Sequence, residues 1–174
     1  QATREELLAA PISLMVGDQS VAFAKPVVLG EPAKGQVTLR REARKGGKVL
    51  ATFDVQVAYD GLVQCTLALS AGRVDGVSLR IPLRREHSRF VHYVGAPHGY
   101  ESQDLPRNSY SKALPDTPGT VFESGFRTTA WVGSNERGLL WCAESDQFWW
   151  PKDRPDAIQI TRKADGAAEL LLNL

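Results

Sequence analysis

Apolar and polar residues alternate along most of this chain, and this period of two limits its fold more than any other feature. The alternation recurs in residues 49–59, 77–83, 158–161 and 168–174, and glycine-centred turn signals separate the runs. Such a run places its apolar side chains on one face of a β-strand. Many short strands joined in this way predict an all-β fold, a two-sheet and mainly antiparallel β-sandwich.

One segment, residues 96–119, interrupts this rhythm with Pro97, Pro106, Pro115 and Pro118. Proline has no N–H to donate to a neighbouring strand, so the segment cannot be a central strand. The sequence therefore predicts a long Pro-rich loop. Long loops without secondary structure are often functional or interfacial, so we expect it either to lie against a neighbouring domain or to be a plain flexible loop.

The most specific motif is WVGSNERGLLWCAESD, residues 131–146. It predicts a β-hairpin that reverses at Asn135 to Gly138, with one tryptophan on each arm. These two residues are Trp131 and Trp141. Because both lie within alternating strands, we expect both indole rings to pack in the core.

Two carboxylates and two adjacent tryptophans follow the hairpin: Glu144, Asp146, Trp149 and Trp150. Aromatic rings beside polar groups suit a sugar-facing surface, because the C–H faces of a pyranose are apolar. Adjacent strand residues point to opposite faces, so at least one of the two tryptophans should be exposed to a sugar or a neighbouring domain. Glu144 and Asp146 would lie about 6.5–7 Å apart at their Cα atoms. That spacing is near the one used by inverting glycosidases, but substrate must enter between the two groups, so a hydrogen-bonding role at a strand end is favoured.

The hairpin pattern W-x-G-x-x-x-R-G-L-x-W-x-x-E-S-D-x-x-W resembles the β-sandwich domain that precedes the catalytic barrel in proteins similar to glycoside hydrolase family 123. A second stretch follows the order of the same domain, at Tyr59 to Val63, Leu67 to Leu69, Val77 to Leu83, His87, and Phe90 to Tyr93. Together the two stretches span residues 48–150. The resemblance implies a non-catalytic module that supports an adjacent catalytic barrel acting on (N-acetyl)hexosaminides.

The resemblance also implies where catalysis takes place. Enzymes of this family are thought to use an adjacent Asp-Glu pair in the barrel, with the 2-acetamido group of the substrate attacking the anomeric carbon. No Asp in this chain is followed by Glu. We therefore assign no catalytic residue here and expect the parent protein to be a bacterial glycoside hydrolase. An extracellular or periplasmic location is favoured by the resemblance alone.

Two other functions stay open. The chain could be an autonomous carbohydrate-binding module with an aromatic platform, or a small self-contained hydrolase that uses Glu144 and Asp146. The residues predicted to contact carbohydrate or a neighbouring domain are Arg137, Glu144, Asp146, Trp149, Trp150, His98 and Tyr100. A support module should expose a broad apolar patch, a binding module a compact aromatic shelf, and an enzyme a cleft with converging carboxylates.

Both cysteines, Cys65 and Cys142, lie in the middle of apolar strands. We expect them to be reduced and mostly buried, because free cysteine behaves as a small hydrophobic residue. A disulfide is the alternative if their strands are neighbours and the compartment is oxidising. The three histidines, His87, His92 and His98, have no ligand spacing, so neither a metal nor another cofactor is expected.

A chain of 174 residues is long enough for one domain with a substantial core. We expect a single domain, residues 1–174, cut from a longer multi-domain protein, since the chain begins with Gln1 and ends within an expected strand. The net charge of +1 gives no reason to expect nucleic acid as a partner. No apolar run approaches the roughly 20 residues that a membrane-spanning helix needs. The expected partner is the adjacent catalytic domain, with carbohydrate as the alternative.

Overall fold

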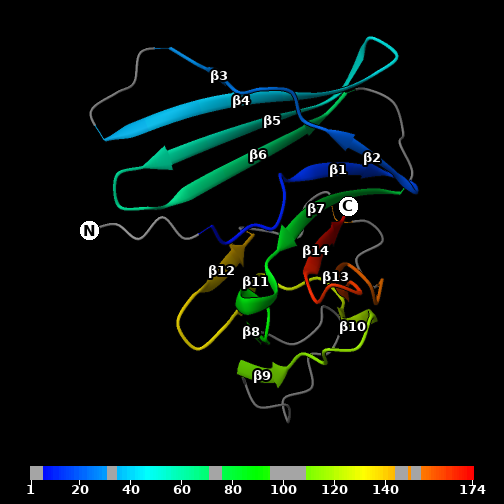
Figure 1. The fold of residues 1–174 in the computed structure, drawn as a ribbon. Coiled ribbons are helices and arrows are strands. Elements are labelled where there is room, and N and C mark those ends of the chain that lie inside the picture. The colour runs from blue at the N-terminus through cyan, green and yellow to red at the C-terminus, as the bar shows by residue number, and fades with distance from the viewer. Residues whose placement is uncertain (1–5, 31–34, 71–75, 95–108, 144–148, 150–153) are drawn as a thin grey trace, which may run out of the picture. The chain divides into compact units, whose positions relative to one another are not determined.

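The fold is known from a computed structural model, which describes residues 6–30, 35–70, 76–94, 109–143, 149 and 154–174. Apart from one short 3-10 helix, the regular elements of this part of the chain are β-strands, so the all-β prediction is confirmed. The strands belong to three mainly antiparallel sheets (Figure 1). The chain divides into two compact units, with residues 12–77 in unit 2 and the remainder in unit 1. A single domain spanning residues 1–174 stays a prediction.

Unit 2 contains a hairpin and a four-stranded sheet in the order β3-β4-β5-β6. Its strands are β1 (Ser13–Val16), β2 (Gln19–Ala22), β3 (Val27–Val28), β4 (Gln36–Lys45), β5 (Lys48–Ala58) and β6 (Val63–Leu69). The basic stretch around Gly46 and Gly47 forms the β4–β5 turn, where both glycines have a positive φ that other residues rarely adopt.

The β4-β5-β6 sheet has one apolar face and one polar face, as the period of two in the sequence predicts. Pairing places Leu39, Val55 and Cys65 side by side on the apolar face. The polar face holds an ion pair in which Arg40 donates to Asp54 at 2.6 and 2.8 Å. This pairing lowers the pKa of the Asp54 carboxyl below its usual value.

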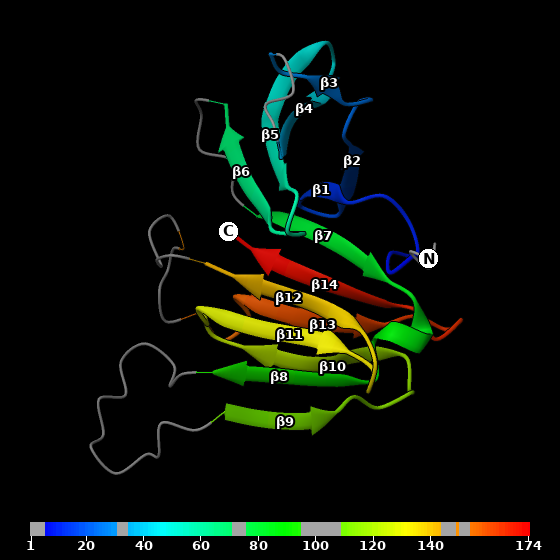
Figure 2. The ribbon, with the colours of Figure 1, turned by 90° about the vertical axis from the view of Figure 1, so that its left-hand side faces the viewer.

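Unit 1 is a sandwich of two sheet layers (Figures 1 and 2). One layer has the order β10-β13-β14-β7, and the other has the order β12-β11-β8-β9. Its elements are β7 (Val77–Leu83), η1 (Arg85–His87), β8 (Phe90–Val94), β9 (Ser109–Ala113), β10 (Gly119–Ser124), β11 (Thr129–Gly133), β12 (Gly138–Cys142), β13 (Ile158–Arg162) and β14 (Ala168–Asn173). The two layers meet where the Tyr93 and Phe122 rings pack with centroids 5.3 Å apart.

The sandwich core is formed by alternate residues of the inner faces. Its largest fully buried apolar members are Leu83, Val91, Val132, Ile158, Ile160 and Leu170. Burying a side chain of this size stabilises the fold by about 1.5–3 kcal/mol. This closed core fixes the strands on which the candidate sites of unit 1 lie.

A buried arginine ties three loops of unit 1 together at one end of the sandwich. Arg162 donates to the backbone oxygen of Ser88 at 2.6 Å, to that of Gly166 at 2.9 Å and to that of Pro115 at 3.2 Å. It also donates to the Ser88 hydroxyl at 2.8 Å. Burial lowers the pKa of Arg162 from its ordinary value. Because Ser88 directly follows η1, these bonds hold that short helix in place.

The Pro-rich segment contains a strand that the sequence did not indicate. Residues 109–113 form β9, which pairs with β8 at the outer edge of its layer. An edge position agrees with the expectation that this segment avoids the centre of a sheet. Residues 95–108 lie outside the described part of the chain. Among the described residues, no helix has the length and apolar character needed to cross a membrane.

Candidate functional site

The β11–β12 hairpin predicted from the sequence is present and ends in a tight turn. The Ser134 amide donates to the Arg137 carbonyl at 2.7 Å, and the Ser134 hydroxyl lies 3.3 Å from the amides of Glu136 and Arg137. Glycines flank this turn at positions 133 and 138, which pair with each other across the hairpin. The two strands therefore have no side chains at this pair of positions next to the turn.

The Trp131 indole occupies the space above these two glycines. A Cβ on Gly138 would lie 2.6 Å from the indole Nε1 and Cζ2 atoms, and a Cβ on Gly133 would overlap the six-membered ring. Only glycine leaves room for the ring to lie over the strands at both positions. Such packing of an aromatic ring over strand glycines is a known way to stabilise a sheet.

Trp131 lies on the outer face of its sheet, so the prediction that it packs in the core is wrong. Its partners across the two neighbouring strands are His92 and Leu140. The His92 ring lies 4.9 Å from the indole ring, and its Nδ1 is hydrogen-bonded to the Ser111 hydroxyl. Leu140 is 58% exposed. The outer face of this layer, here named the Trp131 face, includes Phe90, His92, Val94, Trp131, Leu140 and Cys142.

The other hairpin tryptophan, Trp141, faces the opposite way and packs inside the sandwich. Its ring lies 5.6 Å from Trp149 and 6.1 Å from Phe126, and Phe126 lies 5.1 Å from Trp149. Trp149 is only 8% exposed and is therefore a core residue. Trp150 lies outside the described residues, so the expectation that one of the adjacent pair is exposed stays a prediction.

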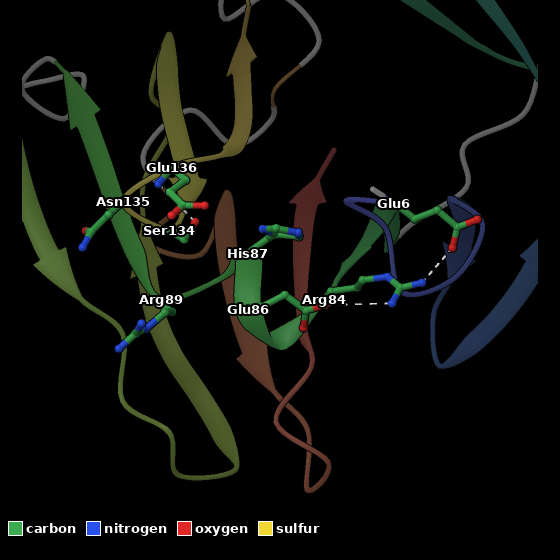
Figure 3. A pocket seen from close by; sticks show the side chains of 8 residues that line it. All are labelled: Glu6, Arg84, Glu86, His87, Arg89, Ser134, Asn135 and Glu136. Carbon is green, nitrogen blue, oxygen red and sulfur yellow. Dashed lines mark hydrogen bonds and ion pairs between the residues drawn. The ribbon is translucent and has the colours of Figure 1, made fainter. Parts of the chain in front are cut away.

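A polar pocket opens beside the hairpin turn, with a volume of about 530 Å³. Its walls come from the N-terminal segment, from η1 and the residues around it, and from the β11–β12 turn (Figure 3). The lining residues are Glu6, Arg84, Glu86, His87, Arg89, Ser134, Asn135 and Glu136. Five of these eight residues are Glu or Arg, and none is Phe, Tyr or Trp, so the described lining offers no large aromatic ring on which a sugar could stack.

Arg84 is engaged within the pocket by two carboxylates. Its guanidinium lies 2.7 Å from Glu6 and 3.9 Å from Glu86 (Figure 3). The Nδ1 atom of His87 is buried and lacks a hydrogen-bond partner among the described residues. These side chains offer hydrogen bonds to a polar ligand, although the Glu6 and Glu86 side chains are largely exposed to solvent.

Unit 2 carries a second candidate surface on the apolar face of its long sheet. At one end of this face, the Phe23 ring stacks on Phe53 with centroids 5.1 Å apart and helps bury Ala43 and Ala51. The other end is not covered to the same degree by the described residues of unit 2. This part, here named the open apolar face, is formed by Val28, Leu39, Val55, Val57, Val63 and Cys65.

The exposure of the open apolar face corrects the prediction for the cysteines. Val28 and Val63 are each 51% exposed, and Cys65 is exposed as well. Cys142, on the Trp131 face, is also exposed, and both thiols are free. The prediction that both cysteines are buried rested on the apolar residues around them in the sequence. It is wrong because these residues lie on sheet faces that the described residues leave open. Neighbouring side chains still remove some water from Cys65, which raises the pKa of its thiol.

Of the predicted contact residues, the structure describes Arg137 and Trp149. Arg137 is half-buried at the hairpin turn, close to the pocket, whereas Trp149 is in the core. Glu144, Asp146, Trp150, His98 and Tyr100 lie outside the described residues, so their roles stay predictions. Within the described ranges, no cluster of three or more His, Cys, Asp or Glu residues could hold a metal ion.

The Trp131 face was missed by the sequence interpretation, although one signal was present. In the motif, Trp131 is followed two residues later by Gly133, and Gly138 lies across the turn. Two glycines on the same face as a tryptophan indicate a ring that lies flat over the sheet rather than one that points into a core.

The comparisons with known proteins identify one family. The protein-family model described as "Glycoside hydrolase 123, third domain" matches residues 1–154. No curated protein and no solved structure matches the chain.

Proposed function

Because this chain belongs to the third-domain family of glycoside hydrolase 123, we propose that it is an ancillary module that docks against a catalytic barrel acting on (N-acetyl)hexosaminides. In this proposal the chain supplies no catalytic residue. It contributes a β-sheet surface that packs against the barrel and stabilises the active site there.

The observation that carries this proposal is the open apolar face of unit 2. Four neighbouring strands present aliphatic side chains there, and Val28 and Val63 are half-exposed. Contiguous apolar surfaces of this kind mark interaction sites in soluble proteins. Covering them with a partner favours the complex by up to about 25 cal/mol per Å² of apolar area removed from water, less the entropy that association costs. A neighbouring domain of the same polypeptide fits this face, because a family described as a third domain implies a multi-domain parent.

Docking can be tested with the catalytic domain of the same polypeptide expressed as a separate protein. We expect the two proteins to form a complex in size-exclusion chromatography and calorimetry. The substitutions Val55→Glu and Val57→Glu should weaken the complex by at least about tenfold, since they place a charge in a buried apolar contact. The matched controls are Thr38→Glu and Gln56→Glu, which add the same charge to the polar face of the same sheet. Equal weakening by both pairs would contradict docking through the open apolar face.

The division of labour between module and barrel has its own test. Aryl N-acetylhexosaminides should be hydrolysed by the catalytic domain and not by this 174-residue chain. Turnover by the chain alone, abolished in Glu144→Gln, would show instead a self-contained hydrolase. Loss of kcat or thermal stability in the barrel when this chain is removed would support the buttressing role.

A further inference from the structure

We propose that Trp131 is a stacking platform for one pyranose ring of a neutral oligosaccharide. This binding function goes beyond the docking role of the module. It lies on unit 1, whereas the docking surface lies on unit 2, so the two proposals can fail independently.

The platform is built by the two glycines that flank the hairpin turn. The six-membered ring of the indole fills the positions where side chains of Gly133 and Gly138 would stand. The indole therefore packs directly against the backbone at both glycines. Trp131 remains partly exposed in this arrangement. A partly exposed indole that is held in place by the backbone can present its electron-rich face to the apolar C–H groups of a sugar ring.

Polar groups for sugar hydroxyls lie beside the indole. His92 is the cross-strand neighbour of Trp131, with ring centroids 4.9 Å apart. Its Nδ1 is engaged by the Ser111 hydroxyl, so Nε2 is the ring nitrogen that a ligand hydroxyl would meet. On the opposite side, Leu140 extends the apolar surface. The combination of one aromatic platform and an adjacent hydrogen-bonding side chain is typical of a small-ligand site.

The composition of the Trp131 face favours a neutral sugar over other ligands. None of its six named residues carries a carboxylate or a permanently positive charge. An anionic ligand such as a phosphate would meet no arginine or lysine among these six described residues. The Trp131 face also differs from the open apolar face, whose six defining residues are aliphatic apart from Cys65 and include no aromatic ring. A single flat indole matches one sugar ring, whereas the row of aliphatic side chains matches a protein domain.

The test uses the 174-residue chain labelled with ¹⁵N, because each indole N–H gives its own NMR signal. The probes are chitohexaose, cellohexaose and methyl β-N-acetylgalactosaminide, which differ in linkage and substituents but share pyranose rings. We expect at least one probe to shift the Trp131 indole signal in a saturable manner, without comparable shifts of Trp141 and Trp149. The Trp131 signal is assigned from its loss in Trp131→Phe.

The variants separate stacking from folding. Trp131→Ala should weaken binding by about tenfold or more, Trp131→Phe by less, and His92→Ala by an intermediate amount. Unchanged signals of Trp141 and Trp149 show in each variant that the sandwich core is intact. The proposal is overturned if no probe shifts the Trp131 signal at about 10 mM, a concentration that detects even weak binding. It is also overturned if Trp131→Ala binds as well as the wild type, or if the attached catalytic domain shields Trp131 from acrylamide and from the probes.

Discussion

The apolar sheet faces of the two units are buried to different degrees. In unit 1, two sheet layers close over each other, and residues such as Ile160 and Leu170 have no exposed surface. Among the described residues of unit 2, the fully buried side chains on the apolar face of the long sheet lie near Phe53, while Val63 is 51% exposed. A sheet normally hides its apolar face against a second layer. The difference indicates that unit 1 has completed its own core, whereas unit 2 has an apolar surface available for a partner.

The largest expected effect comes from shortening side chains in the two apolar faces. Ile160→Ala should lower the free energy of unfolding by about 2–5 kcal/mol, the usual cost of a cavity in a closed core. Val57→Ala should cost less than about 1 kcal/mol, because the side chain is only partly covered. Urea denaturation of both variants measures this contrast. Equal losses would show that the open apolar face is already part of a closed core.

A smaller effect is expected at the glycines beneath Trp131. Gly138→Ala places a methyl group in the space that the Trp131 indole occupies. It should lower the free energy of unfolding by about 1–3 kcal/mol, as overpacking usually does. The matched control is Gly125→Ala, because a Cβ there would lie 3.4 Å from its nearest neighbour, the Arg154 carbonyl oxygen. Thermal denaturation of the two variants compares the sites. A Gly138→Ala variant as stable as the control would mean that the ring does not lie over the hairpin.

The smallest effect concerns one ion pair chosen from each unit. Arg154 donates to Asp156 in unit 1 at 2.8 and 3.0 Å, which lowers the pKa of the Asp156 carboxyl below its usual value. A carboxyl whose pKa is lower in the folded state stabilises the protein at pH values above its unfolded pKa of about 3.9. This stabilisation is lost as the pH falls through the pKa of the folded state. Asp156→Asn should therefore cost up to about 1 kcal/mol at pH 7, discounted because the pair is partly exposed.

The pH dependence separates this contribution from a loss of packing. The difference between Asp156→Asn and the wild type should shrink as the pH is lowered from neutral towards 2. Asp54→Asn in unit 2 should behave in the same direction, because Arg40 lowers the pKa of Asp54 in the same way. A difference that stays constant over this pH range would rule out the carboxylate charge as its cause.

The strands of this fold could be predicted from the sequence because local patterns determine them. The alternation over residues 49–59 gave β5 and its two faces, and the Asn135 to Gly138 signal gave the hairpin turn. The edge strand β9 was missed, because the prolines around it suggested a loop. Its residues have no strong alternation, and pairing with β8 is a tertiary effect that the local sequence does not reveal.

The candidate sites could be predicted only in part. The family resemblance is confirmed, but the sequence did not reveal which apolar faces stay open. Cys65 and Trp131 lie in apolar strands just as Ile160 does, and only the layer packed against each strand decides their exposure. That information is absent from a pattern of period two, which says that residues share a face and not what covers the face.

The most direct test of docking through unit 2 is the reactivity of Cys65, which lies on the open apolar face. The two thiols are alkylated with iodoacetamide above pH 8.5. An alkaline pH is needed because the thiolate is the reactive form and the pKa of the Cys65 thiol is raised. Cys142 is the internal reference, since it lies on the Trp131 face. In the chain alone both cysteines should react, and in the chain joined to its catalytic domain Cys65 should become protected while Cys142 stays reactive. An unchanged rate at Cys65 would contradict the claim that this face is the docking surface.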